Sequence, residues 1–313
     1  MMDIEYLLWL QNIREATGNV LTPAVNWLSH AAITWLVLVP FIVYWCINKR
    51  AGLFLILSLT ISRFLNGITK VTACSYRPYV RNARIIPAGH KPTGYSFPSG
   101  HTMWATPILG GLAVLTRKRS RLFVSFCVIA IILVAFSRNY LGVHTPQDVV
   151  AGTLAGVLSL WLASVIMKHP EHEGSFLAAG ILLCILGVLY TAMKPYPMDY
   201  IDGQLLVDPF KMTFDTFYAA GIAAGLIAGR WIERRYIAFE ATGLNARGII
   251  LAVIGSIPVY FIAGTFAGDY TWLYEVLGGM FTVRGGRFAM GFMLTFWTLA
   301  VWPFVIKMTG GHD

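Results

Sequence analysis

The chain is poor in charge, and this scarcity argues against a soluble globular protein. Only 12% of its 313 residues are Asp, Glu, Lys or Arg, whereas 57% are hydrophobic and the mean hydropathy is +0.64. Apolar runs long enough to cross a bilayer recur along the chain, which is typical of transmembrane helices. We therefore expect an all-α fold, a polytopic membrane helical bundle.

Cysteine is scarce too, and its distribution excludes two further classes of protein. The four cysteines (Cys46, Cys74, Cys127 and Cys184) are scattered, with neither a disulfide framework nor the spacing of a zinc site. The formal net charge of +9 suggests nucleic-acid binding at first sight. We expect no nucleic-acid partner, because the basic residues lie in short connections and motifs and form no continuous face. The N-terminus also lacks the basic segment of a signal peptide.

Nine membrane spans are expected from the apolar runs. They are residues 31–47, 51–69, 99–116, 122–137, 148–167, 174–193, 214–229, 248–268 and 288–306. The first six belong to a core, residues 1–193, that carries all of the motifs described below. Residues 194–313 form a C-terminal extension with three further spans, and no motif there indicates its role. The first thirty residues resemble an amphipathic segment at the membrane surface.

The positive charge in the short connections predicts how the bundle is oriented. Basic clusters gather on one side of the expected membrane: Lys49-Arg50, Arg117-Lys118-Arg119 with Arg121, Lys168, Arg230, Arg234, Arg235, Arg247 and Lys307. Positive connections remain in the cytoplasm. The motifs fall on the opposite side, so we expect the site at the extracytoplasmic boundary of a multi-pass protein, in a bacterial inner membrane.

Three short blocks carry most of the reactive side chains. They are Lys70-x6-Arg77-Pro78, Pro98-Ser99-Gly100-His101 and Ser137-Arg138-x5-His144-x3-Asp148. Arg77 and Arg138 stay protonated, and a guanidinium can hold two phosphate oxygens at once. Lys70 adds a point charge. An isolated surface arginine is usually only solvated, but three cations at one membrane boundary, where an unpaired charge is costly, indicate an anion site.

The second block opens an expected span, so its first turn has unpaired N–H groups and the positive end of the helix dipole. Gly100 allows the backbone to approach a ligand closely, and Ser99 can donate a hydroxyl group. His101 lies in the same turn, where it can give a proton to a leaving oxygen. A lone histidine at a helix start would be an ordinary polar residue.

The third block contains a helix start, Thr145-Pro146-Gln147-Asp148, with threonine as N-cap and proline at the first position. Asp148 can therefore be a capping residue. It can also accept the Nδ1–H of His144, which would leave Nε2 as a free nucleophile. His144 and Asp148 could alternatively bind a metal. We reject this alternative, because Lys70, Arg77 and Arg138 would repel a divalent cation.

Together the three blocks resemble the type 2 phosphatidate phosphatase superfamily, which includes lipid phosphate phosphatases, glucose-6-phosphatase and vanadium-dependent haloperoxidases. The match runs from Lys70 to Asp148, and the helical core around it covers roughly residues 25–193. The resemblance implies a metal-free mechanism without a cofactor. His144 would attack phosphorus to form a phosphohistidine, Asp148 would hold it, and His101 would act as acid and then as base. The phosphoryl oxygens would be held by Lys70, Arg77, Ser99, Gly100 and Arg138.

The substrate remains open at this level. We favour a lipid phosphate or prenyl diphosphate, because a headgroup can enter a polar site at the boundary while its tail stays in the bilayer. The connection 79–97 adds Arg81, Arg84, His90 and Lys91 close to the site. The arrangement of spans also resembles glucose-6-phosphatase, so a soluble sugar phosphate is an alternative, and a lipid phosphotransferase is another.

A transporter or scramblase is a hypothesis of a different class. Arg63 inside the second span and Asp215 near the start of the seventh motivate it, since buried charges often mark transport pathways. The simpler interpretation is that Arg63 supports the site or pairs with a carboxylate such as Asp215.

Overall fold

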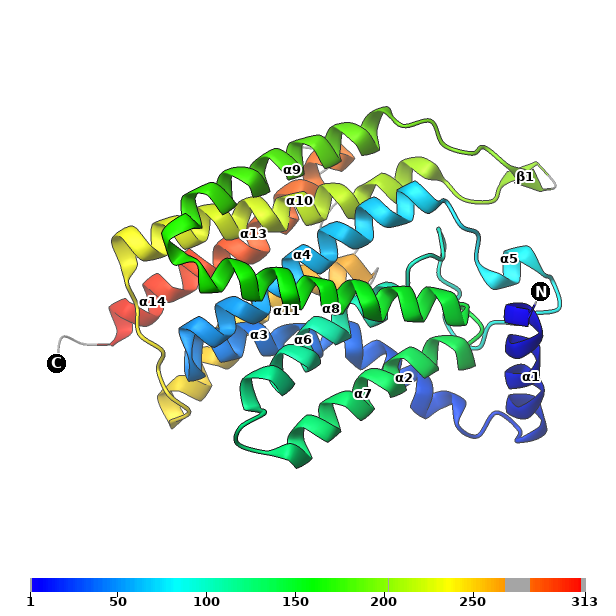
Figure 1. The fold of residues 1–313 in the computed structure, drawn as a ribbon, viewed down its shortest axis with the longest axis horizontal. Helices are drawn as coiled ribbons and strands as arrows, with labels where there is room; N and C mark the ends of the chain where they lie inside the picture. The colour runs from blue at the N-terminus through cyan, green and yellow to red at the C-terminus, as the bar shows by residue number, and fades with distance from the viewer. Residues whose placement is uncertain (1, 202, 268–281, 311–313) are drawn as a thin grey trace.

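The computed structural model describes residues 2–201, 203–267 and 282–310, and these form a bundle of long helices (Figure 1). The helices are α1 (Met2–Ala16), α2 (Thr22–Thr34), α3 (Val39–Ile42), α4 (Lys49–Ala73), α5 (Pro78–Arg81), α6 (Gly100–Thr116), α7 (Arg121–Tyr140), α8 (Pro146–Lys168), α9 (Glu173–Met193), α10 (Pro209–Ile232), α11 (Ala246–Ala267), α13 (Val283–Phe296) and α14 (Trp302–Thr309). The predicted all-α bundle is confirmed.

Short 3-10 helices (η1 and η3) and π-helical segments (η2, η4 and η5) lie between or beside the α-helices. They are η1 (Leu36–Leu38), η2 (Val43–Ile47), η3 (Pro170–His172), η4 (Glu233–Ile237) and η5 (Trp297–Val301). The strands β1 (Tyr200–Ile201) and β2 (Gln204–Leu205) form an antiparallel hairpin between α9 and α10. The protein is therefore an integral, multi-pass membrane protein with almost no β structure in the described residues.

Seven helical stretches of the described chain are long and apolar enough to cross a membrane. They are Thr22–Ile47, Lys49–Arg81, Arg121–Tyr140, Pro146–Lys168, Pro170–Met193, Pro209–Ile237 and Val283–Thr309. Each contains one of the nine expected spans. The other two correspond to α6, which has 17 residues, and to α11, whose apolar part is Ala246–Ile262. Residue 268, the expected end of the eighth span, lies outside the described residues, and the total of nine stays a prediction.

The N-terminal segment differs from its expected layout. α1 lies across one end of the bundle, as a segment at the membrane surface would (Figure 1). The first apolar stretch begins at Thr22, nine positions before the expected start at residue 31. The reason is that His30 and Asn26 interrupt the apolar run in the sequence, whereas the helix continues through them.

Helix α4 is the centre of the bundle, since it packs against α6, α8 and α10. Small residues allow the helices of the bundle to approach closely. A Cβ on Gly152 of α8 would lie 2.3 Å from Oγ1 of Thr102 on α6, and one on Gly221 of α10 would lie 2.0 Å from the carbonyl oxygen of Phe288 on α13. The small-x3-small spacings at Gly152 and Gly221 thus mark tight packing inside the bundle.

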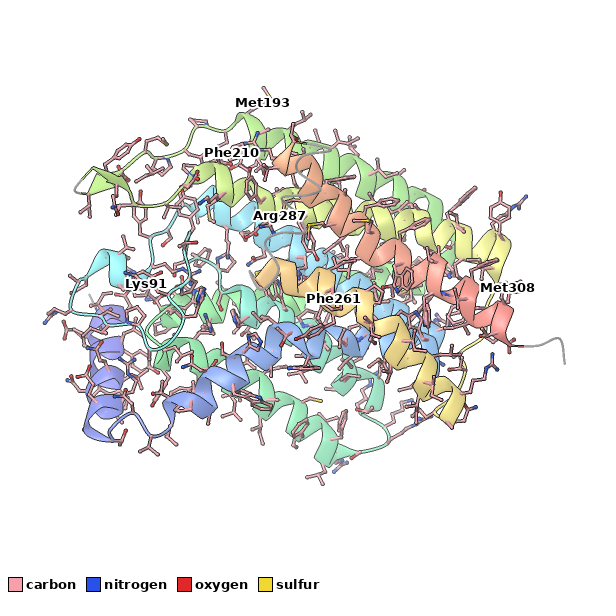
Figure 2. All side chains as sticks on the ribbon, turned by 180° about the vertical axis from the view of Figure 1, so that it is seen from behind. Lys91, Met193, Phe210, Phe261, Arg287 and Met308 are labelled. Carbon is pink, nitrogen blue, oxygen red and sulfur yellow. The ribbon has the colours of Figure 1, made fainter. Side chains whose placement is uncertain are left out.

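The C-terminal extension packs against the core. α10 lies along α4, and a Cβ on Gly67 of α4 would lie 2.9 Å from Oγ1 of Thr216. Near the start of α10, the sulfur of Met212 accepts a hydrogen bond from the backbone N–H of Tyr95 (3.4 Å). The extension thereby touches the loop that precedes the second block. The two ends of the bundle are marked by Lys91 in this loop and by Met308 in α14 (Figure 2).

Candidate active site

The first block lies where α4 ends. Cys74 adopts a left-handed conformation (φ 46°) and its N–H bonds to the Lys70 carbonyl oxygen (3.1 Å), which stops the helix. Arg77 follows and is 5% exposed. Its Nε donates to the Gly94 carbonyl oxygen (3.2 Å) and its Nη1 donates to that of Val143 (2.9 Å). Arg77 therefore ties the first block to the loop that carries the third.

The third block is built on the turn between α7 and α8. Gly142 takes a positive φ of 70°, which brings the chain back toward the bundle. Thr145 then caps α8: its Oγ1 accepts from the Asp148 N–H (3.3 Å), and Oδ2 of Asp148 accepts from the Thr145 N–H (2.8 Å). This reciprocal capping box confirms the predicted helix start.

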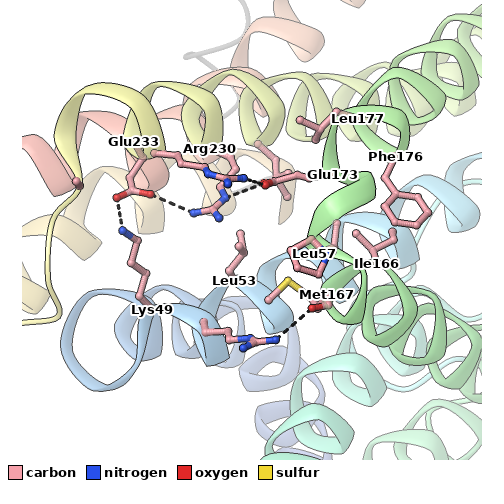
Figure 3. Close-up of a pocket in the computed structure, with 15 residues that line it drawn as sticks. Lys49, Leu53, Leu57, Ile166, Met167, Glu173, Phe176, Leu177, Arg230 and Glu233 are labelled. Atoms are coloured by element: carbon pink, nitrogen blue, oxygen red, sulfur yellow. Dashed lines mark hydrogen bonds and ion pairs between the residues drawn. The ribbon is translucent and has the colours of Figure 1, made fainter.

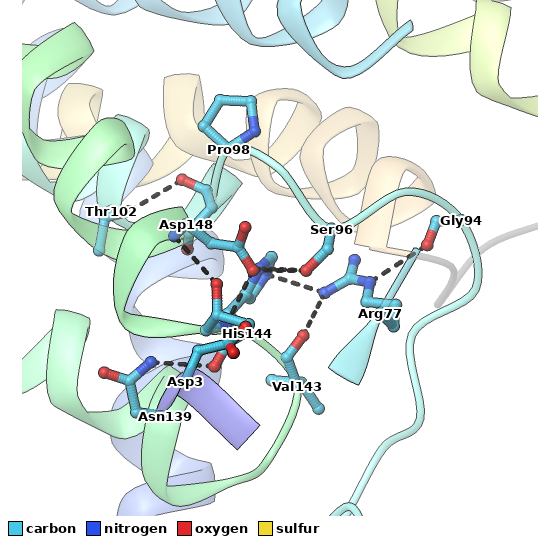
Figure 4. Close-up of polar contacts among 12 residues, drawn as sticks. Asp3, Arg77, Gly94, Ser96, Pro98, Thr102, Asn139, Val143, His144 and Asp148 are labelled. Atoms are coloured by element: carbon cyan, nitrogen blue, oxygen red, sulfur yellow. Dashed lines mark hydrogen bonds and ion pairs between the residues drawn. The ribbon is translucent and has the colours of Figure 1, made fainter. Parts of the chain in front are cut away.

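Asp148 also organises the imidazole of His144 (Figure 4). Its Oδ2 lies 3.4 Å from Nδ1 of His144 and accepts a hydrogen bond from Oγ of Ser96 (2.5 Å). The Ser96 hydroxyl is itself 3.4 Å from the same Nδ1. Asn139 donates to the His144 carbonyl oxygen (2.9 Å) and fixes the backbone. One carboxylate oxygen thus serves both the helix start and the histidine.

The other nitrogen of His144 is not free, contrary to the expectation from the sequence. Nη1 of Arg77 donates to Nε2 at 2.8 Å (Figure 4). Since Nε2 accepts, the ring proton is on Nδ1, the side of Asp148. Burial lowers the pKa of His144 well below 6.5, and the charges of Arg77, Arg138 and Lys70 lower it further. The imidazole is therefore neutral at pH 7.

The second block is joined to the third through the backbone. The N–H of Ser99, the N-cap of α6, donates to the Asp148 carbonyl oxygen (2.9 Å). The Ser99 hydroxyl is buried and has no hydrogen-bond partner among the described residues. Nε of Arg138 is also buried without a hydrogen-bond partner among the described residues, although Nη1 of the same side chain donates to Ser29. Leaving a buried donor unpaired costs about 1–3 kcal/mol. Two such donors beside a cationic cluster are what an anion would satisfy.

His101 and Lys70 belong to the same cluster. His101 interacts electrostatically with His144, Arg138, Arg77 and Lys70, so the three blocks meet in space. Its ring stacks on Trp104, with centroids 6.2 Å apart and planes at 14°. Within the described ranges nothing crowds Gly100, since an added Cβ would only make ordinary contacts of 3.5 Å or more, to Asn66 and Trp104.

Arg63 supports this cluster from inside the bundle. Its guanidinium lies 3.7 Å from the ring centroid of Trp104 and 5.6 Å from that of Tyr218. Asp215 interacts electrostatically with both Arg63 and Lys70. The simpler sequence interpretation, a supporting role near the carboxylate of Asp215, agrees with these contacts.

Ser96 and Asn139 were not predicted from the sequence, and two basic residues of the loop have partners that were not expected. Ser96 lies three positions before Ser99 and Asn139 follows Arg138, but neither belongs to a recognisable motif. Arg81 and Arg84, expected near the headgroup, form ion pairs with acidic residues of α1, namely Asp3 (2.8 Å) and Glu5 (3.1 Å). They hold α1 across the end of the bundle, because its first turn presents these carboxylates to the loop.

Comparison with known proteins identifies the family of the segment that holds the three blocks. Residues 51–170, which contain all three blocks, match the sequence profile of the PAP2 superfamily, so the chain carries a PAP2 superfamily domain and the predicted resemblance is confirmed. The chain is 30% identical over 122 residues to an undecaprenyl-diphosphatase of Sulfolobus acidocaldarius, covering 39% of this chain and 58% of the relative.

Two other relatives are phosphatases by name. A phosphatidylglycerophosphatase B of Escherichia coli K12 is 37% identical over 96 residues, 28% of this chain and 38% of the relative. A sphingosine-1-phosphate phosphatase 2 of Mus musculus is 28% identical over 194 residues, 60% of this chain and 50% of the relative. The chain thus spans about half the length of the curated relatives it matches. No solved structure matches.

Proposed function

We propose that this protein is a membrane-embedded phosphatase that hydrolyses a lipid phosphate or prenyl diphosphate through a phosphohistidine, without a metal ion or cofactor. One observation carries the proposal. A neutral His144, oriented by Asp148, lies against Arg77 in a cluster that also holds two buried donors, on Ser99 and Arg138, with no hydrogen-bond partner in the described part of the chain. These are the parts that phosphoryl transfer to a histidine requires.

In the first step, the phosphoryl oxygens take over the N–H groups of Arg77 and so release Nε2 of His144. The Nε2 lone pair attacks phosphorus and forms a P–N bond, while the P–O bond to the leaving group breaks with its electron pair. His101, protonated when the bound phosphoryl group offsets the charges of the neighbouring cations, gives its proton to the leaving oxygen. The Nδ1–H of His144 stays directed at Asp148, whose negative charge stabilises the cationic phosphohistidine.

The second step returns the histidine to its starting state. His101, now neutral, accepts a proton from a water molecule as the water oxygen attacks phosphorus. The P–N bond breaks, its electron pair returns to Nε2, and inorganic phosphate leaves. Lys70, Arg77, Arg138, the Ser99 hydroxyl and the backbone at Gly100 stabilise the charge on the equatorial oxygens in both steps.

A lipid substrate is supported by the surroundings of the site. The catalytic residues lie at the end of an apolar bundle, and the outer helices expose large hydrophobic side chains such as Leu182 and Leu186 of α9. The named relatives act on a prenyl diphosphate, a phosphoglycerolipid and a sphingoid phosphate. All three names combine a phosphate with a long apolar chain, which favours such a substrate over a sugar phosphate.

The deciding experiment is phosphate release by the detergent-purified protein in EDTA. The panel would contain phosphatidate, a sphingoid-base phosphate, a long prenyl diphosphate and glucose 6-phosphate. We expect release from at least one lipid that survives EDTA, is lost in His144→Ala and is retained in His172→Ala, a control on the exposed η3 segment. Trapping of radiolabelled phosphate on wild-type protein, and not on His144→Ala, would identify the intermediate. Preference for glucose 6-phosphate, or transfer to a lipid acceptor without release, would overturn the proposal.

The orientation is part of the proposal: the site faces the extracytoplasmic side of a bacterial inner membrane. Sealed right-side-out vesicles should hydrolyse an added membrane-impermeant short-chain substrate, whereas inside-out vesicles should do so only after permeabilisation. The reverse pattern would refute the orientation and leave the chemistry untouched.

A further inference from the structure

A cavity lies at the end of the bundle opposite the catalytic cluster, and Figure 3 shows the residues that line it. It has a volume of about 610 Å³ and is lined by residues of α4, α8, η3, α9, α10 and η4. α4 connects the two places, with Lys49 at the cavity and Lys70 at the catalytic end. At about 1.5 Å per residue these positions are about 30 Å apart along the helix, which is about the thickness of the hydrocarbon core. The cavity therefore lies at the headgroup level of the opposite leaflet.

A network of charged side chains forms one side of the cavity. The side chain of Glu233 is fully buried, pairs with Lys49 and accepts from Nη1 of Arg230 (3.2 Å). Glu173 at the start of α9 accepts from Nε of Arg230 (3.1 Å) and pairs with Arg234. These contacts hold α4, α9, α10 and η4 together at the rim.

The charges around the cavity do not cancel. Four cations line it, Lys49, Arg50, Arg230 and Arg234, against the two carboxylates of Glu173 and Glu233. Arg50 pairs with no carboxylate among the described residues and donates to the Met167 carbonyl oxygen (3.3 Å). The side chain of Arg234 is 62% exposed in spite of its ion pair. Arg50 and Arg234 can therefore turn toward an anion while the buried pairs stay intact.

The remaining walls are apolar. They include Leu53, Leu57, Ile166, Phe176, Leu177 and Leu226. Ion pairs that only joined helices would need no apolar cavity beside them. A cationic rim above an apolar wall, at the headgroup level of a bilayer, fits an amphiphile with a negatively charged head.

We propose that this cavity binds an anionic phospholipid of the leaflet opposite the active site. Arg50 and Arg234 bind its phosphate, and one acyl chain lies against Leu57 and Leu177. The site is separate from the catalytic cluster and does not depend on the proposed function. A phospholipid and a soluble phosphate ester both carry the anionic phosphate that the two arginines would bind. The apolar wall selects the lipid over the soluble phosphate ester.

Native mass spectrometry of the delipidated protein would test this inference, with three probes: phosphatidylglycerol, phosphatidylcholine and glycerol 3-phosphate. We expect retention of one phosphatidylglycerol, weaker binding of phosphatidylcholine and none of glycerol 3-phosphate. In Arg50→Gln/Arg234→Gln the phosphatidylglycerol affinity should fall about thirtyfold, since each basic residue near a lipid surface contributes about a factor of five.

Two controls keep the test decisive. Arg117→Gln/Arg119→Gln removes the same charge from the exposed α6–α7 connection, outside the cavity, and should leave the affinity within about twofold. Leu177→Trp fills the apolar wall without changing charge and should also displace the lipid. Arg77→Gln, at the catalytic end, should retain this bound lipid.

Several results would overturn the inference. Equal loss in the two arginine double variants would mean nonspecific attraction to a basic surface. Equal binding of glycerol 3-phosphate would mean a phosphate site without lipid selectivity. If the double variant Arg50→Gln/Arg234→Gln and the single variant Leu177→Trp both retain phosphatidylglycerol, the lipid binds outside this cavity.

Discussion

Replacing Asp148 with asparagine separates its two roles, because all of its side-chain contacts converge on one oxygen. Oδ2 accepts from the Thr145 N–H (2.8 Å) and from Oγ of Ser96 (2.5 Å), and it faces Nδ1 of His144 at 3.4 Å. The amide oxygen of asparagine can occupy the same position and accept the same bonds. The substitution then removes the negative charge and leaves the geometry.

The expected cost in catalysis is large. A unit charge 3.4 Å from a cationic imidazole contributes about 5 kcal/mol at an effective dielectric constant of about 20. This corresponds to a loss of roughly 10³–10⁴ in kcat/KM. A similar loss is typical when the aspartate of a hydrolase triad becomes asparagine. The stability cost is only about 1 kcal/mol, from the lost interaction with the helix dipole.

The assay compares kcat/KM for phosphate release with the thermal midpoint of the same preparation. Thr145→Ala is the matched control, since it removes the cap hydroxyl, costs about 1 kcal/mol of stability and leaves the carboxylate in place. We expect Thr145→Ala to keep activity within about tenfold, at a stability similar to that of Asp148→Asn. If both variants lose activity equally, or if Asp148→Asn retains a tenth of wild-type kcat/KM, then Asp148 is only a capping residue and the reasoning fails.

Three further predictions concern the same cluster. The native pKa of His144 lies below its unfolded value near 6.5, so below pH 6.5 the unfolded chain binds a proton that the native chain does not. The thermal midpoint should therefore fall more steeply from pH 7 to 5 in wild type than in His144→Asn. Equal slopes would contradict the lowered pKa of His144. Arg77→Lys should lower kcat/KM by about 10²-fold or more, since an ammonium group cannot span its three contacts, and a loss below fivefold would refute the need for a guanidinium. Gly100→Ala should raise KM without lowering the thermal midpoint, because no described neighbour crowds the added methyl group. As a control, Gly152→Ala should lower the thermal midpoint, because its Cβ meets Thr102. An unchanged KM in Gly100→Ala would show that Gly100 is not part of the phosphate site.

Much of the site could be predicted from local patterns alone. The start of α8 is encoded in four consecutive residues, so both the cap and the placement of Asp148 relative to His144 follow from helix geometry. The cations near the ends of α4 and α7 also follow from the lengths of the apolar runs. Helix α6 was expected for the same reason, with Gly100 in its first turn.

The contacts between distant segments were beyond the reach of this reasoning. Ser96 reaches Asp148 across 52 positions, and Arg77 reaches Nε2 of His144 across 67 positions. The periodicity of hydrophobic residues in the sequence does not predict such contacts, because they depend on how the loop 79–97 folds over the bundle. The same holds for Arg84, whose partner Glu5 is 79 positions away.

The hydrogen bond from Arg77 to Nε2 of His144 affects how easily electrophiles other than the substrate can react with this imidazole. A buried neutral imidazole would be an easy target for alkylating or acylating compounds that enter from the bilayer. Here the Nε2 lone pair accepts a hydrogen bond from the guanidinium of Arg77. A negatively charged group that binds the guanidinium would compete for this N–H and release the lone pair. In the proposed mechanism an uncharged electrophile would therefore meet an Nε2 whose lone pair is already hydrogen-bonded. A phosphorylated substrate would free this lone pair, because its oxygens bind the guanidinium.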